Sequence, residues 1–220
     1  MAFVGLRHLK LKVGGDDDVA RVRAVRGAVG PDVSLRLDAN GAWSLERATE
    51  ILDAVAPFDI AVVEQPLPRG PVTDLARLRR ASPIPLMADE SLVTPADLEA
   101  LVAARAVDSV NVRVSKCGGL GRSVEIARRA AAAGIGVQVG SQVGETAILS
   151  AAGRHLAAAI EEVTFVEGSY GTLLLTEDVS REAVHFGHRG LAPVLTSPGL
   201  GVTVVADRLR KYARRIVELG

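Results

Sequence analysis

The sequence predicts an α/β fold in which parallel strands and helices alternate as a TIM-type (β/α) barrel. Short apolar runs recur along the chain, and each closes on an acidic residue or a lysine at intervals of 25 to 27 residues. That period fits one strand, one helix and two short loops. Ala, Val and Leu are abundant and aromatic residues make up 3% of the chain, which is typical of helices packed on a parallel sheet. The first five runs close on Lys12, Asp38, Glu64, Asp89 and Lys116.

Helices are predicted between these runs from apolar spacing and capping residues. Valines recur at helical spacing over residues 19–25, after acidic residues that favour a helix N-terminus. Ser44 is expected to cap a helix over residues 45–58. Thr94 is expected to cap another helix, with Pro95 at its first position.

The second half of the chain continues the alternation. A helix over residues 123–134 leads to a strand that ends near Gly140. A further helix over residues 144–160 leads to a last strand that ends near Glu167. The sequence therefore predicts seven strands.

We expect one domain covering residues 1–220, with strand–helix units over about residues 5–175. Residues 176–220 are expected to form an irregular segment, rich in Gly and Pro, followed by a C-terminal helix. That helix, over residues 206–220, reads as basic and amphipathic.

Composition excludes several classes of protein. The 220 residues carry 26 Lys plus Arg and 26 Asp plus Glu, so nothing indicates binding to nucleic acid or to a membrane surface. A single Cys rules out an internal disulfide framework and suits a reducing compartment, from which we expect a cytoplasmic location. The sequence contains no signal peptide and no apolar run of about 18 residues that would span a membrane.

Three acidic residues close consecutive strands, and together they predict a metal site. In a barrel, the carboxylates of Asp38, Glu64 and Asp89 would share one mouth, where they would repel one another unless a cation held them. All-oxygen anionic ligands select a hard divalent ion, Mg²⁺ first and Mn²⁺ second. Zinc is not expected, because no His or Cys lies at these three strand ends.

The lysines are candidate acid–base groups. Lys10 and Lys12 lie two apart on one strand, so both point to the same side of the sheet. Burial and a neighbouring metal cation would depress their pKa and make a neutral amine available as a general base. Lys116 closes a strand beyond the acidic trio. A base on each side of a bound substrate is what removal and return of a proton α to a carboxylate requires, with a metal stabilising the enediolate.

Five ordered motifs carry a resemblance to a known family. KLK, LDAN, EQP, ADES and SKCGG, in this order and spacing, are similar to the enolase superfamily, and within it to the muconate lactonizing enzyme (muconate cycloisomerase) and mandelate racemase-like C-terminal barrel. The resemblance implies Mg²⁺ ligation by the three acids and acid–base roles for the lysines on either side. Carried over by position, the metal ligands are Asp38, Glu64 and Asp89, and the catalytic residues are Lys12, Lys116 and, in an assisting role, Lys10.

The resemblance also implies supporting residues. Asn40 and Glu90 would lie behind the ligands, with Glu90 pairing Lys116, and Asn111 would face the metal region. Glu167 is a weaker candidate for orienting the substrate. No DxD pair follows the last strand, where dipeptide epimerases of this subgroup hold a free ammonium, which disfavours that activity.

The activity implied is abstraction of a proton α to the carboxylate of a small substrate. Cycloisomerisation, racemisation or epimerisation, and dehydration remain open, with cycloisomerase or racemase favoured. The family has an N-terminal cap and a first strand–helix unit ahead of the KLK strand, and this chain begins nine residues before Lys10. We therefore expect a truncated barrel that is impaired alone, or a non-catalytic barrel that needs the missing cap or another chain. Homo-oligomers are also expected, because an open barrel exposes strand edges.

The remaining reactive residues are interpreted as structural. His8 is expected to face the surrounding helices, and Cys117 to be a small packed hydrophobe. Gly118 and Gly119 are expected to form a tight strand-to-helix turn. No catalytic part is expected for His155, His185 or His188.

Overall fold

The computed structural model of the chain describes residues 5–217. The strands are β1 (His8–Lys12), β2 (Ser34–Asp38), β3 (Ile60–Glu64), β4 (Leu86–Ala88), β5 (Ser109–Val112), β6 (Gly136–Val139) and β7 (Phe165–Val166). The α-helices are α1 (Asp18–Val29), α2 (Leu45–Val55), α3 (Val72–Ala81), α4 (Pro95–Ala103), α5 (Leu120–Ala132), α6 (Ala147–Ala158), α7 (Gly171–Leu174) and α8 (Ala206–Tyr212). Two short 3₁₀ helices, η2 (Ala56–Phe58) and η3 (His188–Gly190), complete the described elements. None of these helices combines the length and apolarity needed to cross a membrane.

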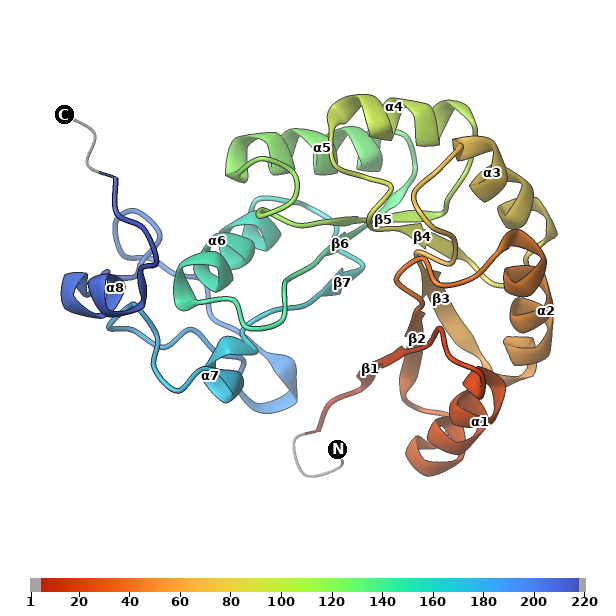
Figure 1. Cartoon of the computed structure of the whole chain (residues 1–220), viewed down its shortest axis with the longest axis horizontal. Helices are drawn as coiled ribbons and strands as arrows, with labels where there is room; N and C mark the ends of the chain where they lie inside the picture. The colour runs from red at the N-terminus through yellow and green to blue at the C-terminus, as the bar shows by residue number, and fades with distance from the viewer. Residues whose placement is uncertain (1–4, 218–220) are drawn as a thin grey trace.

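The seven strands form one parallel sheet whose spatial order follows the chain, so the predicted alternation is confirmed. Register places Lys12 beside Asp38, and Asp38 beside Glu64. The sheet curls as a barrel does, but within residues 5–217 β1 and β7 are not hydrogen-bonded to each other (Figure 1). The result is an open barrel with two free edges.

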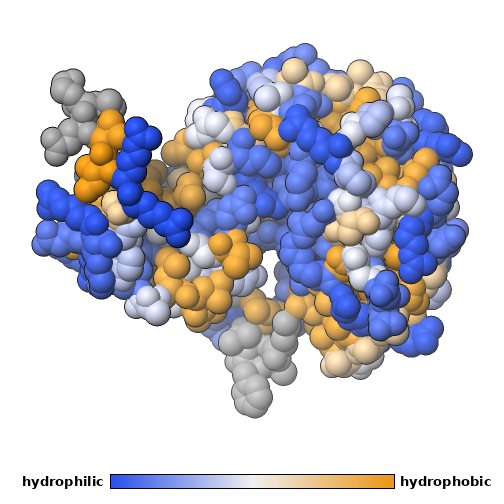
Figure 2. Space-filling view, in the orientation of Figure 1, coloured by the Kyte–Doolittle hydropathy of each residue, from blue (hydrophilic) through white to orange (hydrophobic). Residues whose placement is uncertain are grey.

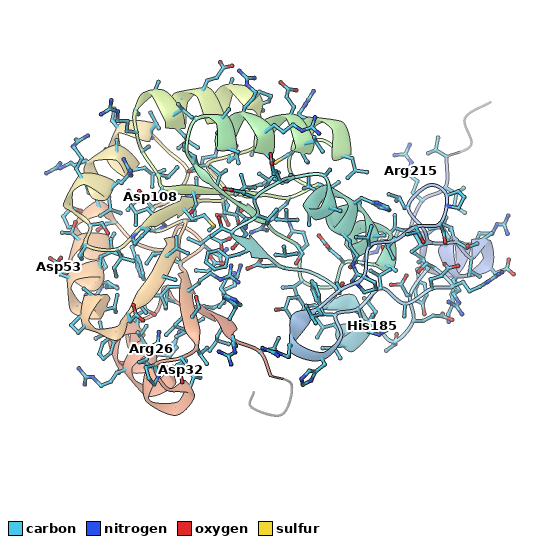
Figure 3. The ribbon with its side chains drawn as sticks, turned by 180° about the vertical axis from the view of Figure 1, so that it is seen from behind. Arg26, Asp32, Asp53, Asp108, His185 and Arg215 are labelled. Carbon is cyan, nitrogen blue, oxygen red and sulfur yellow. The ribbon has the colours of Figure 1, made fainter. Side chains whose placement is uncertain are left out.

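Helices α1 to α6 cover the outer face of the sheet in an arc, and the main hydrophobic core lies between the two layers (Figure 1). Alternate strand residues supply its inner half, such as Leu35 and Leu37 of β2, both fully buried. Helical residues such as Ile51 and Leu52 of α2 supply the outer half. Asp53, on the other side of the same helix, is exposed on the outside of the molecule (Figure 3).

The predicted helix starts are confirmed at two positions. The Ser44 side chain accepts a hydrogen bond from the Arg47 amide at the start of α2. Thr94 and Asp97 form a reciprocal capping box at the start of α4, with Pro95 at the first helical position. These caps satisfy amides that the first helical turn leaves without partners.

The loop between β1 and α1 is built around Asp18, the first residue of the helix. Its buried carboxylate accepts hydrogen bonds from the Gly14 amide at 2.9 Å, the Gly15 amide at 3.1 Å and the Trp43 indole at 3.1 Å. One carboxylate thus ties the end of β1 to the loop that follows β2, which carries the neighbouring strand tip.

The C-terminal region between α7 and α8 is irregular and packs on the barrel through α6. Asp178 accepts a hydrogen bond from the first amide of α6, Ala147, at 2.7 Å. A second, small hydrophobic cluster joins α6 to this segment through Ala147, Ala151 and Val184. His185 of the segment lies well away from the strands (Figure 3).

Two points about the helices differ from or add to the sequence analysis. The alternation implied a helix between the third and fourth strands without giving its bounds, and α3 over residues 72–81 is that helix. The last helix is shorter than predicted, because residues 213–217 are not helical, and residues 218–220 lie outside the described part. Helix α8 has no buried residue, so burial of an apolar face does not stabilise a longer helix there.

Candidate active site

Alternation along the strands gives the sheet a polar inner surface. In β2, Leu35 and Leu37 enter the core, and Arg36 and Asp38 therefore point to the barrel interior. Hydrophilic residues border the hollow at the centre of the molecule (Figure 2). The same alternation on the other strands brings Lys10, Lys12, Glu64, Asn111 and Gln138 to this interior.

The three acidic residues lie at the ends of consecutive strands and are fully buried. Asp38 and Glu64 close β2 and β3, and Asp89 follows β4 directly. Their exposed fractions are 0%, 1% and 0%. The Asn40 amide donates to Asp38 Oδ1 at 3.1 Å, and the Asp89 amide donates to the Gln65 side chain at 2.9 Å, so strand-end loops fix the backbone beside both acids.

Lys10 lies among the carboxylates. Its Nζ is 3.2 Å from Asp38 Oδ2, 3.2 Å from Glu64 Oε2 and 2.8 Å from Glu167 Oε1. Burial by itself lowers the pKa of Lys10, but these three carboxylates outweigh it and raise that pKa. The predicted depression of this pKa assumed a neighbouring metal cation; without one, Glu167, 157 positions further along the chain, adds a third negative charge beside Lys10.

Lys12 lies at the outer rim of the same strand, with 58% of its side chain exposed. Its Nζ donates to Asp38 Oδ2 and to Asn40 Oδ1, each at 2.6 Å. Asn40 in turn donates to Glu90 Oε1 at 3.1 Å. Burial would raise the pKa of Asp38, but Lys10 and Lys12 outweigh it and keep that pKa below its ordinary value.

Lys116 approaches the acids from the other side. Lys116 was predicted to close a strand, and that prediction is wrong. Strand β5 stops at Val112, and Lys116 lies in the turn that follows. Its Nζ donates to Asp89 Oδ1 at 2.7 Å, and among the described residues its ion-pair partner is Asp89 instead of the predicted Glu90. Burial lowers the pKa of Lys116 to about 8, and the Arg113 guanidinium acts in the same direction.

Three polar residues of the interior were not predicted. Arg113 forms ion pairs with Asp89 and, at 3.7 Å, with Glu64. Arg36 pairs with Glu167 at 3.2 Å, and its guanidinium lies 4.3 Å from the centre of the Phe165 ring. Gln138 is fully buried beside them. Strand alternation could have identified two of them. Arg36 lies two residues before Asp38, and Gln138 lies two residues before Gly140, so each faces the same side of its strand as the residue at the predicted strand end.

Glu64 is held by neutral amides as well as by cations. Asn111 Nδ2 donates to Glu64 Oε1 at 2.6 Å, and Gln138 Nε2 donates to Glu64 Oε2 at 3.2 Å. Asn111 therefore contacts one of the acidic residues, and its predicted place beside a metal stays a prediction. Gln138 makes the equivalent contact from the next strand.

The chemistry of the carboxylates fits a divalent ion, although no metal cage is assembled. Within residues 5–217, no three His, Cys, Asp or Glu side chains come close enough together to hold a metal. The ammonium of Lys10 lies between Asp38 and Glu64, and the guanidinium of Arg113 between Glu64 and Asp89. Three buried carboxylates thus already draw cations between them, which is the chemistry that a hard ion requires.

The residues interpreted as structural behave mostly as expected. Cys117 is buried, and Gly118 and Gly119 form the turn before α5, with φ of 85° and 96°. His8 does not face the helices. It shares a side with the lysines of β1, and its ring lies 6.0 Å from that of Phe165, on the last strand.

The fold and this ring of acids and lysines define an enolase-type barrel, and the family comparison agrees. Residues 2–208 match the family described as Enolase C-terminal domain-like, and the chain belongs to that family.

Relatives in this family carry out more than one reaction. The chain is 34% identical to the N-succinyl-L-Arg/Lys racemase of Bacillus cereus over 213 residues, which is 94% of this chain and 56% of the racemase. It is 33% identical to muconate cycloisomerase 1 of Rhodococcus opacus, covering 94% of this chain and 57% of that protein. The crystal structure of a dipeptide epimerase from Cytophaga hutchinsonii, complexed with Mg and the dipeptide D-Ala-L-Val, superposes with a TM-score of 0.89 at 34% identity, covering 96% of this chain and 57% of the epimerase. The chain therefore spans a little over half the length of these relatives.

Proposed function

We propose that this chain forms the barrel part of a Mg²⁺-dependent enzyme that removes a proton α to the carboxylate of a small substrate. The observation that carries the proposal is the order of groups across the interior. Three buried carboxylates from consecutive strand ends lie between Lys12 on one side and Lys116 on the other. The named activities of the relatives, racemase, epimerase and cycloisomerase, support this reading.

Asp38, Glu64 and Asp89 would hold Mg²⁺, or Mn²⁺ in its place. The bound ion would supply a positive charge that binds the substrate carboxylate and stabilises the negative charge that develops after proton loss. When the ion binds, its contacts with these acids would replace the contacts that they now make with Lys10 and Arg113.

Lys12 and Lys116 would exchange the proton from opposite sides of the substrate. Lys116, with a pKa of about 8, loses its proton readily enough to act as a base near neutral pH. The side chain of Lys12 is exposed and free to move towards the substrate, and Asn40 orients the Lys12 amine. Lys10, held by three carboxylates, is better suited to electrostatic support than to proton transfer.

Glu167 favours substrates without a free ammonium. It lies at the end of β7, where an acid could hold such a group, but both of its oxygens are already engaged. Oε2 accepts a hydrogen bond from Lys10 at 3.0 Å, and Oε1 one from Arg36 at 3.2 Å. A dicarboxylate or an N-acylated amino acid therefore fits better than a free dipeptide, which favours cycloisomerase or racemase activity.

A second candidate is a non-catalytic barrel that functions only with another segment or chain. Among the residues that the structure describes, the outer edges of β1 and β7 are unpaired, which favours this candidate because free strand edges associate readily. The share of the relatives that the chain spans, 56% to 57%, is consistent with both candidates. Homo-oligomer formation or docking of a cap segment belongs to this second proposal.

Calorimetric titration of the chain with Mg²⁺ tests the metal proposal. We expect one site, which Asp89→Asn abolishes. Asp53→Asn, on the exposed face of α2, is the matched control and should bind as the parent does. Unchanged affinity after joint replacement of Asp38, Glu64 and Asp89 by their amides would rule out the assignment.

Proton exchange tests the lysine roles. The chain, joined to the N-terminal part of a relative, is incubated in D₂O with Mg²⁺ and each enantiomer of an N-succinyl amino acid, and deuterium uptake is followed by NMR. Lys12→Ala and Lys116→Ala should each slow turnover by about 10²-fold or more, and each should retain exchange with one enantiomer only. If Lys12→Ala exchanges both enantiomers at the parent rate, Lys12 is not a base.

A further inference from the structure

We propose that Asn111 and Gln138 are positioning residues that fix the carboxylate of Glu64 for cation binding. We further propose that residue 140 is glycine because the Asn111 amide fills the space of a side chain there. The inference rests on the proposed function, since it assigns Glu64 to the ion, and it concerns how the chain prepares that ligand.

The two amides bind different oxygens of one carboxylate. Asn111 Nδ2 donates to Oε1 at 2.6 Å and Gln138 Nε2 to Oε2 at 3.2 Å. All three side chains are buried, with exposed fractions of 0% to 1%. Asn111 and Gln138 are register partners on β5 and β6, so the sheet itself sets the spacing between the two donors. Contacts at both oxygens fix the rotation of the carboxylate, which a single contact would leave free.

Neutral donors suit this task. A lysine or arginine partner neutralises a carboxylate and competes with an incoming ion. An amide orients the carboxylate and leaves its negative charge available to the ion. Partners of this kind commonly orient metal ligands, and their loss costs about 10- to 100-fold in metal affinity.

Gln138 is itself held in orientation by Arg36. The Arg36 guanidinium donates to Gln138 Oε1, which turns the amide nitrogen towards Glu64. Glu167 accepts from the same guanidinium at 3.2 Å. A continuous chain of contacts therefore runs from the last strand to Glu64 through side chains that the strands point inward.

Gly140 provides the room for Asn111. A β carbon added at residue 140 would lie 1.9 Å from Asn111 Oδ1 and 2.7 Å from Asn111 Nδ2. The φ of Gly140 is not in the left-handed region, so an alanine there conflicts with the Asn111 amide and not with the backbone, and the amide would have to shift. Asn111 Oδ1 is buried without a hydrogen-bond partner, so the contact with Glu64 through Nδ2 is the one that orients this amide.

The test is metal affinity, with Mn²⁺ as the probe, followed by electron paramagnetic resonance and calorimetry. Asn111→Leu and Gln138→Leu should each bind Mn²⁺ about 10- to 100-fold more weakly than the parent. Gln142→Leu removes an exposed amide from the loop after β6 and should leave the affinity unchanged. Thermal melts in a chelator establish that each variant folds.

Gly140→Ala tests the orientation of the Asn111 amide separately from any general loss of folding, because it adds only one methyl group. In the parent it should weaken Mn²⁺ binding about as much as Asn111→Leu does. In an Asn111→Ala background, where the obstructing amide is gone, it should cause no further loss. Gly121→Ala, at an unobstructed position of α5, is the control for adding a methyl group and should bind as the parent does.

The outcomes separate this inference from the proposed function. If the parent binds no Mn²⁺, both fail. If the parent binds Mn²⁺ and both leucine variants bind equally well, the metal proposal survives and the positioning role is refuted. Equal losses from Gly140→Ala in the two backgrounds would refute the steric explanation for the glycine.

Discussion

Replacing Asp18 with alanine should destabilise the barrel at the loop that supports the lysine strand. The change removes the carboxylate that accepts hydrogen bonds from three donors, the amides of the exposed residues Gly14 and Gly15 and the buried indole of Trp43. Water can reach the two amides, so their loss is partly compensated. The indole would stay buried without a partner, which costs about 1–3 kcal/mol. With the lost contacts to the amides and the helix N-terminus, we expect a total of about 2–4 kcal/mol.

Urea unfolding monitored by tryptophan fluorescence measures this loss directly, because Trp43 is the single tryptophan of the sequence. With a urea dependence of about 2 kcal/mol per molar, the midpoint should fall by about 1–2 M. Asp53→Ala, an exposed acid on α2, is the matched control and should stay within about 0.5 kcal/mol of the parent. A midpoint for Asp18→Ala equal to that of the control would refute the reasoning.

Two further predictions concern stability. Burial alone would raise the pKa of Asp97, but hydrogen bonds from Thr94 and Val93 and the charge of Arg69 outweigh it and lower that pKa. The capping box should therefore stabilise the fold above the unfolded-state pKa of about 3.9 and lose its effect as pH falls through the lower folded-state value. Asp97→Asn should lower the free energy of unfolding, measured with urea at pH 7, by about 1 kcal/mol, and this difference from the parent should disappear below about pH 4. A difference in stability that does not change with pH would contradict this. At Gly171, a β carbon would lie 1.9 Å from the Glu145 carbonyl oxygen. Gly171→Ala should therefore force α7 and the loop after β6 apart and lower the free energy of unfolding by about 1–3 kcal/mol. A melting temperature equal to that of the parent would show that the two segments separate without cost.

Much of the barrel and part of its interior could be predicted from local patterns. The strand ends at Asp38 and Glu64 followed from apolar runs of constant period, because consecutive parallel strands must lie side by side. The common side of Lys10 and Lys12 followed from strand alternation alone. The Thr94 cap followed from residue types within one helical turn.

The partners across the interior could not be predicted in this way. The pKa of Lys10 depends on Glu167, and the sequence does not say how far the sheet curls to bring the two together. Lys116 was placed on a strand because its run is apolar, yet the chain turns after Val112 and delivers the amine to Asp89 from a loop.

The sequence by itself determined which residues carry charge, the strand ends at Asp38 and Glu64 and the side of the sheet that Lys10 and Lys12 face, because these depend on residue type and a period of two. Only the tertiary structure decided which charges meet. Curvature of the sheet brings β7 towards β1 and β2, so Arg36 reaches Gln138 and Glu167 across more than 100 positions of the chain. Such contacts depend on the curvature of the whole sheet, which residue type and local alternation do not determine.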